Sequence, residues 1–232
     1  MVVQSSTASP TDSFGYICHR CSRCCRNKHI QLTPYEVARL ARARNESTSE
    51  FRAAWTIDGQ GTALRQKEDG TCVFLGPQGC EVHTDRPLVC RLYPLARHVD
   101  LDGTEHYTVL EGHPLSEGEF TKQGKIADYL AAQGATPYMS AHDSYFQWLH
   151  WAHKKLDLAL EASVSKGSEG ADDSGLLDMD SMITRYCATT GKSEPDNIDD
   201  RLQLHLQALY AVVVQLEVQH DEANRKVGED RA

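Results

Sequence analysis

The chain has 232 residues, of which 40% are hydrophobic, and a formal net charge of -9 at pH 7. A chain of this length can bury a substantial core, and its acidic balance argues against a nucleic-acid partner. No stretch approaches the roughly 20 apolar residues that cross a bilayer, and the first residues lack the basic start and apolar run of a secretory leader. We therefore expect a cytoplasmic protein that binds neither membrane nor nucleic acid.

The chain begins with a polar segment followed at once by a run of cysteines. Residues 1–15 are mostly small and polar, which predicts a disordered tail. Cys18, Cys21, Cys24 and Cys25 come next, too densely spaced for a regular helix or strand. The run predicts a loop wrapped around a ligand, because cysteines in a reducing compartment are more often metal ligands or catalytic thiols than disulfides.

Two short helices are expected after this loop. The four residues from Thr33 read Thr-Pro-Tyr-Glu, which provides an N-cap, a proline at the first helical position and a capping-box glutamate. This helix should run to about Arg44. The four residues from Ser47 read Ser-Thr-Ser-Glu and predict a second helix that begins in the same way.

A second cysteine group, Cys72, Cys80 and Cys90, lies among short apolar runs and turns. Residues 95–101 and 106–110 flank an Asp-Gly turn, and this pattern predicts an antiparallel hairpin. The part of the chain up to about residue 110 is therefore expected to contain both helices and strands.

Helical periodicity dominates the rest of the chain. Helices are predicted at residues 120–132, 138–160, 179–188 and 198–224. The whole pattern predicts an α+β fold made of a disordered tail (1–15), a cysteine-rich domain (16–110), a helical region (111–160), a low-hydrophobicity linker (161–177) and C-terminal helices (178–232).

The cysteine spacing indicates a metal site. A two-residue gap lets two sulfurs turn toward one ion, and consecutive gaps of this kind resemble the run that holds three irons of a four-iron cluster. The candidate ligands are Cys18, Cys21, Cys24, Cys25, Cys72, Cys80 and Cys90. The eighth cysteine, Cys187, lies on the apolar face of a predicted helix and is expected to be a buried structural residue.

Two kinds of metal fit this donor set. Zinc takes four ligands in a closed tetrahedron, so that two zinc sites would need a shared sulfur or a histidine, for which His29, His83 and His98 are candidates. A 4Fe-4S cluster would use four thiolates and leave three for a second metal, a redox pair or a substrate. Both remain alternatives on the sequence alone.

Basic residues accompany the cysteines. Arg20, Arg23, Arg26 and Lys28 interleave with the first group, where we expect them to offset thiolate charge, with docking of an acidic partner as the alternative. Arg86 and Arg91 flank Cys90 and are expected to neutralise sulfur or to pair with carboxylates, with substrate recognition as the alternative.

The order of these motifs resembles the YkgJ-type CxxCxxCC cysteine-cluster family, described as a zinc- or iron-chelating domain. The resemblance covers about residues 16–98. It rests on CxxCxxCC, Leu32-Thr-Pro, Gly70-Thr-Cys72-Val-Phe-Leu75, Gly79-Cys80 and Arg86-Pro-Leu-Val-Cys90-Arg-Leu-Tyr-Pro94. It implies that the seven cysteines chelate the metal and that Arg86, Pro87, Arg91 and Pro94 complete the pattern around Cys90. Ser22 stands where members often have glycine, and His83 where tyrosine is common.

The resemblance leaves more than one function open. The first is binding of an iron-sulfur cluster or zinc, with a redox role and a protein redox partner. Flagellin lysine N-methylases contain a similar domain, so a protein-modifying enzyme acting on a protein substrate is an alternative, although no glycine-rich nucleotide-binding turn is visible. A purely structural zinc module is the third.

Overall fold

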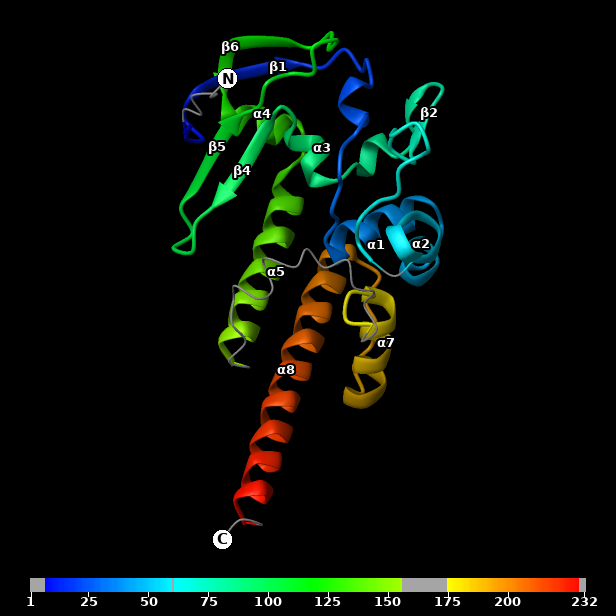
Figure 1. The fold of residues 1–232 in the computed structure, drawn as a ribbon, viewed down its shortest axis with the longest axis vertical. Helices are drawn as coiled ribbons and strands as arrows, with labels where there is room; N and C mark the ends of the chain where they lie inside the picture. The colour runs from blue at the N-terminus through cyan, green and yellow to red at the C-terminus, as the bar shows by residue number, and fades with distance from the viewer. Residues whose placement is uncertain (1–6, 60, 156–174, 230–232) are drawn as a thin grey trace. The chain divides into compact units, whose positions relative to one another are not determined.

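The fold is described by a computed structural model that covers residues 7–59, 61–155 and 175–229 (Figure 1). The chain divides into two compact units. Unit 1 comprises residues 1–32 and 63–139, and unit 2 comprises residues 33–62 and 140–232. Helices and small antiparallel strand pairs occur together, which confirms the predicted α+β class. Among the described residues, no helix is both long and apolar enough to cross a bilayer.

Unit 1 is built on three antiparallel strand pairs. They are β1 (Ser13–Ile17) with β6 (Glu119–Lys125), β2 (Leu75–Gly76) with β3 (Gly79–Cys80), and β4 (Leu95–Val99) with β5 (Glu105–Val109). The β4–β5 pair confirms the predicted hairpin. The helical elements are the 3-10 turns η1 (Arg23–Cys25) and η3 (His83–Asp85) and the helices α3 (Leu88–Leu92) and α4 (Ile126–Ala132). Helix α5 (Thr136–Lys155) runs from unit 1 into unit 2.

Two segments of unit 1 differ from the sequence prediction. Part of the expected disordered tail is ordered: Ala8 exchanges two backbone hydrogen bonds of 2.8 Å with Tyr107, and residues 13–15 already belong to β1. Residues 120–125, predicted to be helical, form a strand instead, in which Phe120 pairs with Tyr16. A partner about 100 residues away supplies these strand contacts, and such tertiary pairing overrides local propensity.

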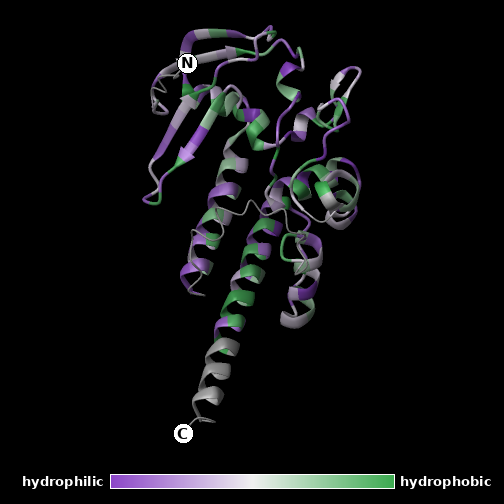
Figure 2. Cartoon of the chain, in the orientation of Figure 1, coloured by the Kyte–Doolittle hydropathy of each residue, from purple (hydrophilic) through white to green (hydrophobic). Residues whose placement is uncertain are grey.

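Unit 2 consists of α1 (Pro34–Ala43), α2 (Thr48–Trp55), the 3-10 turn η2 (Ile57–Gly59), α7 (Met179–Thr190), α8 (Ile198–Glu229) and the end of α5. Both predicted capping boxes are present, at Thr33 and at Ser47. Hydrophobic residues recur along α8 (Figure 2), and Leu202, Leu209 and Val213 are buried on it. Most of the predicted linker 161–177 lies outside the described residues, as does the predicted end of the helix before it.

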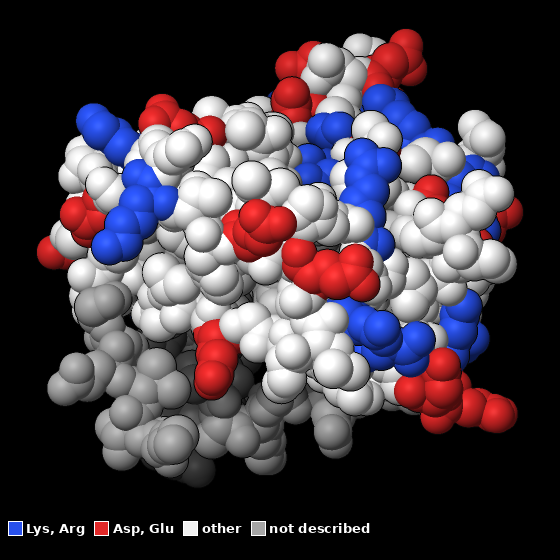
Figure 3. Space-filling view, turned by 90° about the horizontal axis from the view of Figure 1, so that it is seen from above, with Lys and Arg blue, Asp and Glu red and all other residues white. Residues whose placement is uncertain are grey.

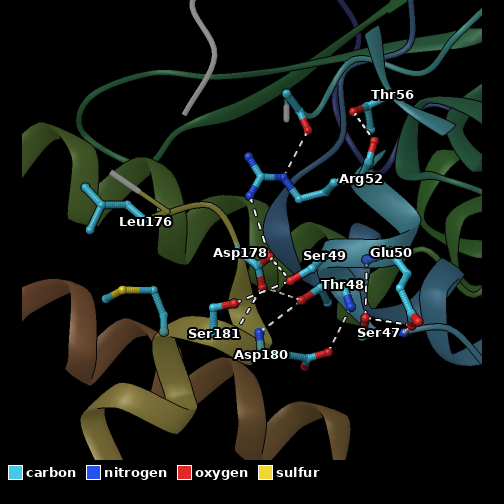
Figure 4. Close-up of polar contacts among 12 residues, drawn as sticks. Ser47, Thr48, Ser49, Glu50, Arg52, Thr56, Leu176, Asp178, Asp180 and Ser181 are labelled. Atoms are coloured by element: carbon cyan, nitrogen blue, oxygen red, sulfur yellow. Dashed lines mark hydrogen bonds and ion pairs between the residues drawn. The ribbon is translucent and has the colours of Figure 1, made fainter. Parts of the chain in front are cut away.

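Helices α2 and α7 of unit 2 are joined at their first turns by Asp178, the N-cap of α7 (Figure 4). Its carboxylate accepts hydrogen bonds from the Thr48 hydroxyl at 2.6 Å, the Ser49 hydroxyl at 2.5 Å and the Ser181 amide at 3.1 Å. The Arg52 guanidinium lies 3.9 Å away, and both side chains are more than nine-tenths buried. This buried charge takes its partners from α2 and from the first turn of α7.

Candidate metal centre

The first cysteine group lies in a tightly turned loop. Arg20, Ser22 and Asn27 have φ angles of 55°, 60° and 52°, in the left-handed region. Non-glycine residues adopt this region uncommonly, and it reverses the chain locally. The predicted loop is therefore confirmed in its first part, whereas Cys24 and Cys25 lie in the short turn η1.

Backbone hydrogen bonds tie this loop to the segment that carries the second cysteine group. The Cys72 amide donates to the Cys25 carbonyl at 2.8 Å, and the Asn27 amide donates to the Gly70 carbonyl at the same distance. The cysteines at 18–25 and at 72 are thus neighbours, although α1 and α2 separate them in sequence. Cys80 follows in β3, and Cys90 lies in α3.

Three thiols accept a hydrogen bond from the backbone amide two residues further on. Burial raises the pKa of the Cys72 thiol, and the Phe74 amide opposes that rise. Cys80 has the same arrangement with the Val82 amide, and its pKa is also raised. At Cys21 burial is outweighed by the amides of Glu117 and Arg23, which lower the pKa. Amide donors of this kind stabilise a thiolate and orient it toward a metal.

Five thiols share one electrostatic neighbourhood. A side-chain hydrogen bond between Cys24 and Cys25 lowers the pKa of Cys24 to about 7 and raises that of Cys25, to which the nearby thiols of Cys90 and Cys80 also contribute. Cys72 in turn contributes to the raised pKa of Cys80. Repulsion between the thiolates thus helps to keep protons on Cys25 and Cys80, and a cation among the thiols would relieve that repulsion.

The other two candidates are placed differently. Cys18 is linked to the group indirectly, since it and Cys24 both raise the pKa of Tyr129, after burial as the largest cause. The Cys21 thiol faces Ser116 and Glu117, and its hydrogen bonds involve no other cysteine. The structure therefore places Cys24, Cys25, Cys72, Cys80 and Cys90 within electrostatic range of one another, with Cys18 nearby and Cys21 turned toward residues 116–117.

The donor set fits zinc or an iron-sulfur cluster in its chemistry. All eight cysteines lie in the described part of the chain, and they form no disulfide there. Within those same ranges no three Cys, His, Asp or Glu side chains are already close enough to enclose an ion. The Arg23 Nε is buried without a hydrogen-bond partner among the described residues, directly beside Cys24. Buried donors normally have a hydrogen-bond partner, so an unpartnered cationic donor here indicates that an anionic group bound at the thiols would accept its hydrogen bond.

Arg86 and Arg91 have different roles. Arg86 donates to the His83 carbonyl at 2.8 Å and to the Gln133 side chain at 2.6 Å, and its charge acts on the Cys80 and Cys90 thiols, as expected. Arg91 is 6% exposed and binds the carbonyl oxygens of residues 84, 86 and 133 and the Tyr138 hydroxyl. The expectation that Arg91 pairs with sulfur or carboxylate is wrong, because backbone carbonyls take its donors.

The remaining basic side chains lie mostly at the surface. Arg20, Arg26 and Lys28 are exposed, and Arg26 is 3.7 Å from Asp69. Lys and Arg side chains gather in a band on the face shown in Figure 3, with acidic groups beside them. Neither Gln133 nor the 116–117 turn was expected near the cysteines, since no local sequence pattern marks a polar residue that contacts a site 30 or more positions away.

The three candidate histidines are separated. His83 lies in η3, where burial and the charges of Arg86, Arg20 and Arg91 lower its pKa, so that its imidazole is held neutral as a metal ligand requires. His29 is exposed after the loop. His98 lies in β4 and stacks on His106. Arg86 is a charged neighbour of both His83 and the thiol group.

Replacing Ser22 with glycine is expected to raise the free energy of unfolding by up to about 1 kcal/mol, because the left-handed conformation costs an L-residue about 1–2 kcal/mol and glycine much less. The Ser22 side chain makes only a long, 3.4 Å bond to the Arg20 carbonyl. Ser22→Val should lower the unfolding free energy instead. Urea unfolding of the metal-loaded protein measures both, and equal stability of the two variants would contradict the explanation.

Unit 1 thus has the features of a small thiolate-ligated metal-binding domain: a turned cysteine loop, amide-to-sulfur hydrogen bonds and a second cysteine group within reach. Residues 17–116 match the model of a protein family described as "CxxCxxCC: Putative zinc- or iron-chelating domain". The resemblance found in the motifs is confirmed over this segment. Neither a curated protein nor a solved structure matches the chain.

Proposed function

We propose that residues 17–116 hold an iron-sulfur cluster through thiolates, in the form of a 4Fe-4S cluster bound by four of the seven cysteines. The observation that carries this proposal is the buried Arg23 Nε without a partner among the described residues. A cluster adds bridging sulfides to its thiolates, and both kinds of sulfur accept hydrogen bonds, whereas a zinc site offers only its thiolates as acceptors.

The ligands come from the five thiols that interact with one another and from Cys18 close by. The bound cluster would supply one-electron transfer. The chain's own contribution is to position the sulfurs and to set the potential: the amides of Phe74 and Val82 donate to Cys72 and Cys80, and such hydrogen bonds tune a cluster. A protein redox partner follows from this role.

A second candidate is a pair of zinc sites, and His83 favours it. Its lowered pKa keeps the imidazole available as a ligand. Seven thiolates and one imidazole make eight donors, which is the number that two closed tetrahedral sites require. In that case the zinc is structural, or the protein stores or delivers it, and the site takes no part in electron transfer.

Anaerobic purification followed by an absorption spectrum and analysis for iron, sulfide and zinc on one sample tests the proposal. Iron with matching sulfide and a broad thiolate-cluster band near roughly 400 nm is the expected result. Bleaching of this band by dithionite would show that the cluster is also redox-active. Zinc alone, without sulfide, would overturn the cluster and leave the zinc sites as the function.

Removing the metal with excess chelator is expected to raise amide hydrogen exchange in unit 1 while α7 and α8 stay protected, because metal-binding energy is folding energy only for the unit that holds the metal. Amide exchange in helices α1 and α2 is the most informative part of this measurement. These helices lie between the two cysteine groups in sequence but belong to unit 2, so they too should stay protected. Opening of α1 and α2 together with the cysteine loop would contradict the two-unit division.

A further inference from the structure

The β4–β5 hairpin of unit 1 has two unlike faces. Side chains alternate along each strand, so that Tyr107 is buried and Arg97 lies 2.7 Å from Glu105 on the same face. The opposite face is open and carries His98 directly across from His106 in the strand register. The two imidazole rings stack with centroids 4.9 Å apart and an angle of 14° between their planes.

One ring nitrogen of each imidazole lies beside a polar side chain. The His98 Nε2 lies 3.3 Å from the Thr108 hydroxyl, and the His106 Nδ1 lies 3.6 Å from the Asp100 carboxylate. Metal-binding histidines commonly use one nitrogen for the ion and direct the other to a carboxylate or hydroxyl, which fixes the ring. His106 with Asp100 has this arrangement, and His98 with Thr108 is its counterpart across the hairpin.

We propose that His98 and His106 chelate a divalent transition-metal ion of the zinc, nickel or copper class at a site separate from the thiols. With nitrogen-to-metal distances of about 2.1 Å, two ligands of a tetrahedral ion lie roughly 3.4 Å apart. The ring centroids are 4.9 Å apart. Because each nitrogen lone pair lies in its ring plane, both side chains must turn out of the stack so that one nitrogen of each ring points at the same ion. Water completes the coordination, and the rigid register of the strands holds both ligands on one face.

The test adds Ni²⁺ to the metal-loaded, full-length, tag-free protein and follows paramagnetic broadening of backbone amides by NMR. Selective broadening around residues 96–108 is expected at low Ni²⁺. His98→Gln and His106→Gln should each raise the Ni²⁺ concentration for half-broadening at least tenfold, because each leaves a single imidazole ligand. The double variant should lose selective broadening at the hairpin. Asp100→Asn should weaken binding to a smaller extent.

His113→Gln is the matched control, because His113 is an exposed histidine of the same unit whose ring Nδ1 accepts a hydrogen bond from the Leu115 amide in its own turn. It should leave the broadening at the hairpin unchanged. Retained protection of the Tyr107 amide, which donates to the Ala8 carbonyl, from hydrogen exchange in each variant shows that the hairpin is intact. Broadening confined to the cysteine segments, or an equal effect of His113→Gln, would overturn the proposal. Neither result depends on whether the thiols hold iron or zinc.

Discussion

Cys24→Ser and Cys90→Ser are each expected to lower the apparent metal affinity at least tenfold, whereas Cys187→Ser should leave it unchanged. Changes to residues that merely orient a ligand already cost about 10–100-fold, and loss of a ligand costs at least as much. Cys24 and Cys90 both act electrostatically on Cys25 within the thiol group. Cys187 is buried in α7 of unit 2. Competition with a chromophoric chelator, together with metal analysis, measures the difference.

The metal content of Cys21→Ser shows whether Cys21 is a ligand like Cys24. The sequence ranks Cys21 with the other ligands, but its thiol is bound to the amides of Glu117 and Arg23 and to no other cysteine. Metal loss as large as that of Cys24→Ser would mean that metal binding draws Cys21 into the group. Retention of metal would make it a residue that fixes the loop. Equal loss in Cys187→Ser would refute the ligand assignment altogether.

Asp178→Ala is expected to lower the free energy of unfolding by about 3–5 kcal/mol, the usual cost of removing one partner of a buried ion pair. The substitution leaves the Arg52 charge buried and strips the Thr48 and Ser49 hydroxyls of their acceptor. It also removes the cap of α7. Urea unfolding monitored by far-ultraviolet circular dichroism measures the loss. Asp200→Ala, an exposed carboxylate in the first turn of α8, is the control and should cost less than about 1 kcal/mol.

Low pH should reproduce part of the loss of stability expected for Asp178→Ala. Burial raises the pKa of Asp178, but the hydroxyls of Ser49 and Thr48 and the amide of Ser181 outweigh it and hold the pKa below its usual value. A carboxyl whose pKa is lower in the folded state stabilises the fold above its unfolded pKa of about 3.9. That contribution is lost as the pH falls from there through the folded pKa. Asp178→Ala should therefore show a flatter fall of stability below about pH 4 than the wild type, and parallel curves would contradict this account.

The helix starts show how much local sequence can decide. Thr33 and Ser47 each precede a glutamate by three residues, and both form the capping boxes that this spacing predicts. The Asp-Gly turn at 102–103 likewise predicts the β4–β5 hairpin. Ser22, which stands where the family resemblance implies glycine, has a left-handed φ that glycine adopts at little cost. In each case the responsible atoms lie within a few residues of one another, so that the pattern is complete in the local sequence.

The seven N-terminal cysteines, their grouping and the metal-binding class were also determined by the sequence, because thiol chemistry and two-residue spacing depend on nothing distant. Only the tertiary structure decided that 119–125 is a strand on β1, that α1 and α2 belong to unit 2, and that Arg91 serves backbone carbonyls. It also decided which thiols meet. These outcomes depend on partners 40 to 130 positions away, whose proximity arises from chain packing and leaves no local pattern.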